Sequence, residues 1–127
     1  MAKPGATGLR RILNAGYYSF KGFKAGFKHE AAVRQELFLA IPLTLLSFYL
    51  ADDLAVLLLL IILPWLTLAF ELVNSAIEAV VDRIGNEYHE LSGRAKDLGS
   101  ACVFVLLILT LFAYFAAFMY KFALWSF

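Results

Sequence analysis

Two long apolar segments limit the folds that are open to this chain. The first runs for 17 residues, Leu54 to Phe70, interrupted only by Pro64 and Thr67, and the second runs from Ala101 to Tyr120. A helix needs about 20 predominantly apolar residues to cross the hydrocarbon core of a bilayer. The chain is 62% hydrophobic and its mean hydropathy is +0.77, which lies far outside the soluble range. The sequence therefore predicts an all-α membrane protein that forms a single domain, residues 1–127.

A third apolar segment precedes these two and is shorter. Leu37 to Ala51 has only 15 residues, but extending the helix back to Ala31 gives it enough length to cross a bilayer. The extension puts Arg34, Gln35 and Glu36 at the cytoplasmic end of the helix, where long side chains can reach the interface or face other helices. We therefore expect three transmembrane helices, within residues 30–51, 54–84 and 91–121.

The charge distribution predicts the orientation of the three spans. Seven of the eleven Lys and Arg residues lie between Lys3 and Arg34, before the first span. Positive charge close to a span favours the cytoplasmic side. We expect a cytoplasmic N-terminus, a C-terminus on the outer side, and residues 82–100 in the cytoplasm.

Residues 7–28 have the pattern of an amphipathic surface helix. Apolar side chains gather on one helical face, and basic side chains lie toward the flank of that face, as in helices that lie in a membrane surface. The apolar set is Leu9, Ile12, Leu13, Phe20, Phe23 and Phe27. Gly16, Gly22 and Gly26 argue against one straight helix. The alternative is a basic flank that only fixes the topology.

A polar stripe continues the second apolar segment. Glu71, Asn74, Glu78 and Asp82 follow one another at intervals of 3, 4 and 4 residues, which places them on one helical face. At about 1.5 Å per residue, Glu71 lies at the inner edge of the hydrocarbon, Glu78 about 10 Å further out, and Asp82 about 6 Å beyond Glu78. Polar side chains at the end of a span are costly unless they face protein, water or a ligand, so this stripe is the first candidate for a functional site.

The residue types at this face favour chemistry with a hard cation. The sequence contains neither G-x-x-x-x-G-K-[ST] nor G-x-G-x-x-G, so it lacks the familiar phosphate-binding loops. Carboxylates suit Mg²⁺, which usually takes one or two of them together with phosphate oxygens and water. Glu71 and Glu78 stand too far apart along one helix to share a metal, so Glu78 needs a partner from another segment. Glu30 is predicted at a suitable depth.

The same stretch resembles a known family. Residues 71–101, E-L-V-N-S-A-I-E-A-V-V-D-R-I-G-N-E-Y-H-E-L-S-G-R-A-K-D-L-G-S-A, are similar to the signature of the small integral-membrane diacylglycerol kinases of bacteria. The resemblance continues upstream through R-R-I-L-N-A-G-Y-Y-S-F-K-G and E-A-A-V-R-Q-E, and it covers essentially the whole chain. Pro42 and Pro64 are not part of the pattern and leave the geometry of their helices open.

The resemblance implies an ATP:diacylglycerol phosphotransferase of the inner membrane that produces phosphatidic acid. Members of this family are homotrimers with three sites at the cytoplasmic surface, each shared between neighbouring subunits. The implied fold is thus a homotrimeric helix bundle built from a single diacylglycerol kinase domain. The implied cofactor is Mg²⁺ with ATP as co-substrate, and the implied partners are a membrane lipid and other copies of the chain, with no nucleic acid.

Residue by residue, the match implies Glu71 as the general base and Glu30 and Glu78 as metal and nucleotide ligands. The other implied nucleotide contacts are Arg11, Tyr18, Glu87, Tyr88, His89, Lys96 and Asp97. Asn74 and Asp82 are supporting polar residues, and Arg11, Glu71 and Ser100 border the lipid substrate.

Simpler interpretations stay open for several of these residues. Asp82 and Lys96 could form an ordinary interfacial ion pair, and Tyr88 and His89 could only pack at headgroup level. Two other functions compete: an undecaprenol kinase with the same chemistry on a polyprenol, and a non-enzymatic membrane transport subunit. Residues 54–70 contain no ionisable side chain that could pass an ion onward, which argues against transport.

Overall fold

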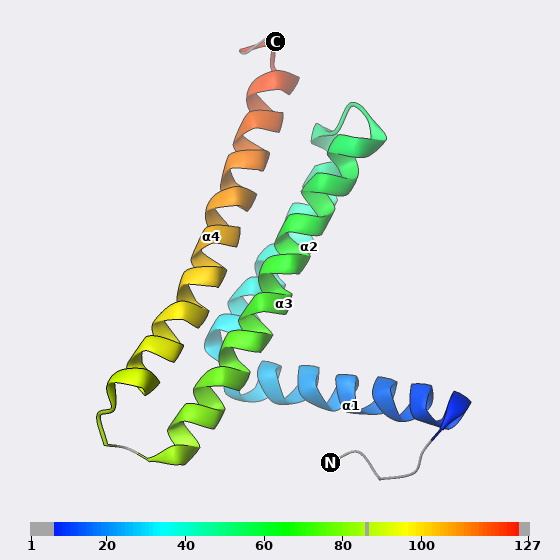
Figure 1. The fold of residues 1–127 in the computed structure, drawn as a ribbon. Helices are drawn as coiled ribbons and strands as arrows, with labels where there is room; N and C mark the ends of the chain where they lie inside the picture. Colours follow the sequence, from blue (N-terminus) through cyan, green and yellow to red (C-terminus); the bar gives the residue numbers. More distant parts are fainter. Residues whose placement is uncertain (1–6, 86, 125–127) are drawn as a thin grey trace.

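Helices make up most of the described part of the chain. The computed structural model describes residues 7–85 and 87–124, and these form four helices: α1 (Gly8–His29), α2 (Ala31–Leu50), α3 (Leu54–Ile84) and α4 (Glu90–Lys121) (Figure 1). Helices α2, α3 and α4 are each long and apolar enough to cross a membrane. The predicted all-α class and its three candidate spans are therefore confirmed.

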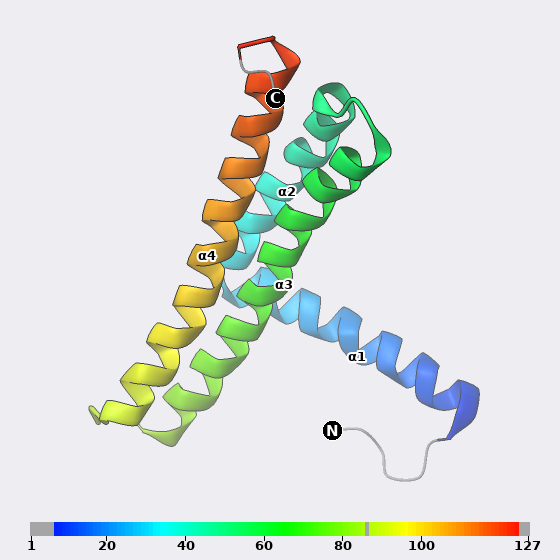
Figure 2. The same ribbon diagram turned by 45° about the horizontal axis from the view of Figure 1, so that its top comes forward.

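The three long helices run side by side, with α3 in contact with both α2 and α4 (Figures 1 and 2). The turn between α2 and α3 and the C-terminal end of α4 lie at one end of this bundle. The connection from α3 to α4 lies at the other end. Helix α1 begins its path away from the bundle at the start of α2 and projects outward at a steep angle to the long helices, and α3 and α4 continue past the level of α1 to their connection (Figure 1).

The junction between α1 and α2 is fixed by backbone geometry and one arginine. Glu30 adopts an extended conformation, φ −107° and ψ 120°, and its N–H donates to the carbonyl of Gly26 at 2.8 Å. The Arg34 guanidinium donates to the carbonyl of Phe27 at 3.0 Å, which satisfies a group left free at the C-terminus of α1. These contacts hold α1 at its angle to the bundle.

Helix α1 is continuous, so the prediction that its glycines would interrupt it was wrong. A glycine inside a helix costs only about 1 kcal/mol relative to alanine, which a helix of 22 residues can absorb. Gly26 also has a packing role, because a Cβ there would lie 2.8 Å from Cδ2 of Leu72 on α3. That glycine lets α1 approach α3.

The interior of the bundle changes from apolar to polar along its length. Near the α2–α3 turn, Leu50, Leu60, Tyr114 and Ala117 form a buried apolar cluster. Further along, the hydroxyls of Thr67 and Thr110 meet at 3.4 Å and join α3 to α4. Hydroxyl groups of this kind commonly link helices inside membranes.

Two prolines lie inside helices without ending them. Pro42 is within α2 and Pro64 within α3. Pro64 has no N–H, so the carbonyl of Leu60, four residues earlier, loses its donor in the helix. The hydroxyl of Tyr114 on α4 donates to that carbonyl at 3.0 Å and also reaches the carbonyl of Leu43 on α2 at 2.8 Å. One side chain thereby joins three helices at the point that the proline weakens.

Candidate active site

The polar stripe predicted from the sequence lies on α3, at the end of the bundle beside α1. Glu71, Asn74 and Ser75 are all buried, with exposed fractions of 7%, 6% and 9%. Glu71 follows the apolar part of α3 directly, because the run Leu54–Phe70 ends one residue before it. Burying a carboxylate, an amide and a hydroxyl together is expensive unless other groups compensate.

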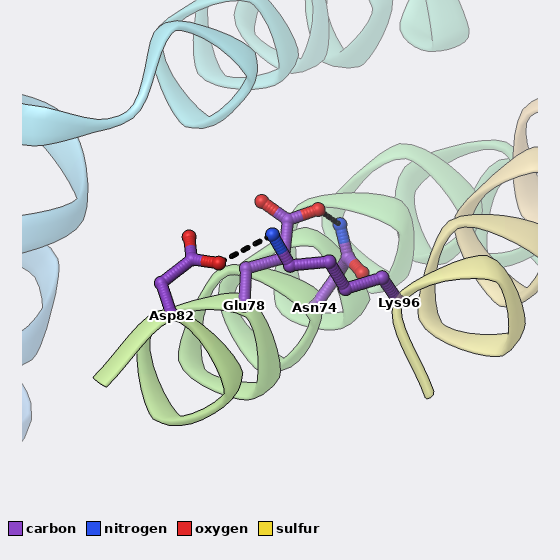
Figure 3. A network of polar contacts seen from close by, with 4 residues as sticks. All are labelled: Asn74, Glu78, Asp82 and Lys96. Carbon is purple, nitrogen blue, oxygen red and sulfur yellow. Dashed lines mark hydrogen bonds and ion pairs between the residues drawn. The ribbon is translucent and has the colours of Figure 1, made fainter. Parts of the chain in front are cut away.

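Asn74 links two carboxylates on this face. Its Nδ2 donates to Oε1 of Glu78 at 3.3 Å (Figure 3). The Asn74 side chain also interacts with the carboxyl of Glu71. The other end of the amide is unsatisfied: Asn74 Oδ1 is a buried side-chain atom without a hydrogen-bond partner within the described residues.

Exposure to solvent rises along the stripe. Glu71 is buried, Glu78 is half-buried, and the side chain of Asp82 is 63% exposed. Asp82 forms an ion pair with Lys96 of α4, with Nζ and Oδ1 2.5 Å apart (Figure 3). The ion pair that the simpler interpretation predicted between Asp82 and Lys96 is therefore present. Such an exposed pair contributes only about 0–1 kcal/mol to stability.

Three other carboxyl groups lie near Glu71, which makes a cluster of four from three parts of the chain. Glu36, Glu78 and Glu30 all lie close enough for their charges to act on Glu71. Glu36 was not predicted as a site residue. The signal in the sequence was a carboxylate within a predicted span, which usually faces other helices or a polar cavity. Within the described residues, none of the four forms an ion pair with a lysine or arginine.

This set of ligands fits a magnesium ion only when phosphate completes the coordination. No group of three or more His, Cys, Asp or Glu side chains in residues 7–85 and 87–124 is arranged to hold a metal by itself. Mg²⁺ is usually held by one or two carboxylates plus phosphate oxygens and water. Clustered carboxylates without cationic partners meet that requirement. Glu30, Glu36 and Glu78 are half-buried, whereas Glu71 is buried.

Two cavities flank the stripe. One, of about 560 Å³, lies between α1 and α3 and is lined by Ser19, His29, Glu30 and Ser75 among others. The second, of about 280 Å³, lies at the α3–α4 connection, and its lining includes Asp82, Glu87, Tyr88, His89 and Lys96. The first borders the apolar end of the stripe and the second its exposed end.

Comparison with known proteins identifies the family. The family model described as prokaryotic diacylglycerol kinase matches residues 17–118, most of the chain. The chain belongs to that family. The diacylglycerol kinase of Haemophilus influenzae is 52% identical over 101 residues, covering 80% of this chain and 86% of the relative. That of Escherichia coli K12 is 50% identical over 102 residues, covering 80% and 84%, and that of Helicobacter pylori 26695 is 41% identical over 105 residues, covering 83% and 82%.

The resemblance to the bacterial diacylglycerol kinases, which rested on residues 71–101, is thus confirmed. The matched stretch contains every site residue carried over from the family except Arg11. Arg11 lies six residues before its start, in the first half of α1.

Only some of the predicted site residues of this kinase line a common cavity. Glu87, Tyr88, His89 and Lys96 share the second cavity. Seven of the predicted site residues line neither cavity: Arg11, Tyr18, Glu71, Asn74, Glu78, Asp97 and Ser100.

Tyr88 and His89 have different environments. Tyr88 is 91% exposed, which leaves its ring accessible to a nucleotide or to lipid headgroups. His89 has a structural function, because it is the N-cap residue of α4 and its Nδ1 accepts from the N–H of Leu91 at 3.2 Å. Such a cap satisfies one of the free N–H groups at a helix start. It leaves Nε2 of the ring available to a ligand.

Proposed function

We propose that this protein is an ATP-dependent diacylglycerol kinase. It transfers the γ-phosphoryl group of MgATP to the hydroxyl of diacylglycerol at the cytoplasmic membrane surface and produces phosphatidic acid. Its membership of the prokaryotic diacylglycerol kinase family and the names of relatives that are 41–52% identical support the reaction. The roles of individual residues rest on the geometry of α3.

The observation that carries the assignment of roles is the gradient of exposure along one helix. Buried Glu71 is followed by half-buried Glu78 and then by exposed Asp82. The hydroxyl of a diacylglycerol lies at the membrane interface, whereas MgATP is soluble only in water. A helix with one carboxylate at the membrane interface and another in water can bring the two substrates together. The lipid then stays in the membrane and MgATP stays in water.

In this proposal Glu71 is the general base. Its carboxylate accepts the proton of the lipid hydroxyl while the hydroxyl oxygen attacks the γ-phosphorus and the bond to the ADP oxygen breaks. The proton leaves later from Glu71 to water. The transition state of phosphoryl transfer is loose, so most of the catalysis comes from positioning and charge neutralisation, and a base contributes about 10²–10⁴-fold.

Glu30 and Glu78 hold the magnesium nucleotide. They approach from different parts of the chain, the α1–α2 junction and the middle of the polar stripe. The metal supplies neutralisation of phosphate charge when it is bound. Asn74 holds Glu78 in place through its hydrogen bond, and the cluster of four carboxylates around Glu71 favours a ligand that brings positive charge.

Lys96 and the residues of the second cavity form the nucleotide end of the site. Lys96 pairs with Asp82 through one N–H, and a lysine ammonium has three such donors. It can therefore keep Asp82 as a partner and still donate to a phosphate. Glu87, Tyr88 and His89 extend this cavity away from the membrane, and Arg11, Tyr18 and Asp97 complete the nucleotide contacts.

We further propose a homotrimer in which each site is shared between subunits. Large apolar side chains are exposed along α2, α3 and α4, so these helices have surface to contact lipid and other copies. Arg11, Tyr18, Asp97 and Ser100 stand apart from the two cavities of their own chain, and a neighbouring copy offers them a place in a shared site. Helix α1 lies in the cytoplasmic surface of the inner membrane with its phenylalanines toward lipid.

The test is transfer of label from γ-labelled ATP to diacylglycerol in mixed micelles by the purified protein. The diagnostic variant is Glu71→Gln, which keeps the size and hydrogen bonding of the side chain but cannot accept the proton. We expect kcat to fall by about 10²–10⁴-fold, with the affinity for an ATP analogue nearly unchanged. The matched control is Glu90→Gln, which removes a carboxyl from the exposed first turn of α4.

Three outcomes would contradict the proposal at different points. No labelled phosphatidic acid from the parent protein refutes the reaction. Preferred labelling of a polyprenol in direct competition makes the protein an undecaprenol kinase. Near-normal kcat in Glu71→Gln, or a loss of nucleotide binding, removes Glu71 from the role of base.

A further inference from the structure

At the site, α4 packs against α3 at a glycine without an assigned role. Gly99 of α4 is buried and lies against Asn74 of α3. A Cβ built on Gly99 would overlap Asn74 Oδ1, and it would lie 3.3 Å from Asn74 Cγ and 3.7 Å from Asn74 Cα. The nearest groups all belong to one residue. The space that an alanine methyl would need at Gly99 is filled by the Asn74 amide.

The orientation of that amide explains why the space matters. Asn74 Nδ2 donates to Glu78, so the opposite atom, Oδ1, has to point toward α4. At that place Oδ1 is buried and has no hydrogen-bond partner within the described residues. An unsatisfied buried acceptor is costly, and rotating the amide would be the usual relief. Rotation here would turn a carbonyl oxygen toward the Glu78 carboxylate, so the present orientation is the one that serves Glu78.

We propose that Gly99 is a positioning residue for the phosphoryl-transfer site. Because it lacks a side chain, α4 leaves room for the Asn74 amide in the one orientation that presents its NH₂ group to Glu78. Gly99 touches neither substrate and acts only through Asn74. The inference rests on the proposed kinase function, since it concerns how Glu78 is held for the magnesium nucleotide.

An alanine at position 99 leaves two ways to relieve the overlap, and both disturb the site. Either the Asn74 amide rotates and loses its hydrogen bond to Glu78, or α3 and α4 move apart at the level of Glu78. A displacement of the order of 1 Å in a positioning group can reduce turnover by about 10²-fold. Gly26 provides a contrast, because the atom in its way is the mobile end of Leu72, a long apolar side chain.

The experiment is a double-mutant cycle on the full-length protein with Gly99→Ala, Asn74→Ala and the double variant. We expect Gly99→Ala to lower kcat/KM for MgATP at least tenfold, to raise the magnesium concentration for half-maximal rate, and to leave KM for diacylglycerol within about twofold. We expect Asn74→Ala to have a similar effect. Truncating Asn74 removes the overlapped atoms, so the double variant should match Asn74→Ala within about twofold instead of showing the product of the two losses.

The control for the glycine-to-alanine change itself is Gly16→Ala, an exposed position with no atom within 4 Å of the added Cβ. It should retain the parental kcat/KM. If Gly99→Ala stays within twofold of the parent, Gly99 does not position Asn74. If the two losses multiply in the double variant, Gly99 acts independently of Asn74, and the inference is wrong.

Thermal unfolding of the same variants tests the inference without the reaction. Gly99→Ala should lower the midpoint of unfolding, and the added Asn74→Ala should restore part of that loss because the methyl group then has room. If Gly99→Ala fails to fold, the double variant should still fold. Equal losses of the fold in both would overturn the inference. This readout stays valid even if the parent protein transfers no phosphate to diacylglycerol, which separates the failure of the two proposals.

Discussion

Replacing Tyr114 by phenylalanine should destabilise the bundle, because the carbonyl of Leu60 would lose its hydrogen-bond donor. The ring of Tyr114 is 8% exposed, and its single O–H is shared between the carbonyls of Leu60 and Leu43, both within hydrogen-bond distance. Phenylalanine keeps the packing of the ring and removes only the hydroxyl. Within its helix, the Leu60 carbonyl then has no donor, because the residue four positions later is Pro64.

The magnitude follows from that unsatisfied carbonyl. Leaving a buried acceptor without a partner costs about 1–3 kcal/mol in proteins generally. Hydrogen bonds between helices in membranes are worth less, about 0.6 kcal/mol on average and about 1.7 at most. Because this hydroxyl serves an acceptor that has lost its helical donor, we expect Tyr114→Phe to cost about 1–1.5 kcal/mol of unfolding free energy.

The decisive measurement compares this cost in two backgrounds. Pro64→Ala supplies the missing N–H, so in that background the Leu60 carbonyl regains a helical donor and Tyr114→Phe should cost only about 0.5 kcal/mol. Reversible unfolding in mixed micelles with increasing denaturing detergent gives the four free energies. Tyr49→Phe is the matched control, because Tyr49 is 59% exposed, and it should change stability by less than about 0.5 kcal/mol. An equal cost of Tyr114→Phe in both backgrounds would refute the reasoning.

Three further predictions concern the site and the topology. Glu78→Ala should abolish transfer and weaken magnesium-dependent nucleotide binding, and Glu78→Asp should keep a trace of turnover; unchanged magnesium dependence would remove Glu78 from the metal site. Lys96→Ala and Lys121→Ala each break an exposed ion pair, with Asp82 and Asp52 respectively, so both should alter stability by less than about 1 kcal/mol. Only Lys96→Ala should raise KM for ATP, and an equal rise in both would separate Lys96 from the nucleotide. A reporter fused to the C-terminus should lie on the outer side, and cytoplasmic signal would contradict the three-span topology.

The three long helices could be predicted from the sequence because each apolar segment is close to the length that a helix needs to cross a membrane. Leu54–Phe70 and Ala101–Tyr120 could not be soluble strands or loops, and the polar stripe after Phe70 has helical spacing, so one long α3 followed. The prediction failed for α1, where the glycines argued against one helix and the structure has a continuous one. Propensity penalises Gly26 in a helix, but the contact that glycine allows with Leu72 is a tertiary effect and is invisible in the sequence.

Two residues at the candidate site, Glu36 and Gly99, were not predicted from the sequence, also because tertiary contacts bring them there. Glu36 comes close to Glu71 only because α2 packs beside α3, and Gly99 meets Asn74 only because α4 packs on the other side. Spacing along one helix predicts which residues share a face. It does not predict which residue of another helix stands opposite.

The arrangement around Glu71 also bears on why the four carboxyl groups remain together. Like charges in a partly desolvated region repel one another, and no ion pair within the described residues relieves the four groups. The charge of Lys96 reaches Glu78, but the ion pair of Lys96 is with Asp82, further toward solvent. A site that served only stability would gain by replacing one of the four carboxylates with an amide. In the proposed reaction, binding of a divalent cation with its nucleotide would relieve this repulsion, so the groups that destabilise one another in the free protein would favour the complex. The proposed binding of a magnesium nucleotide therefore gives the carboxylate cluster a physical reason that packing of the bundle does not.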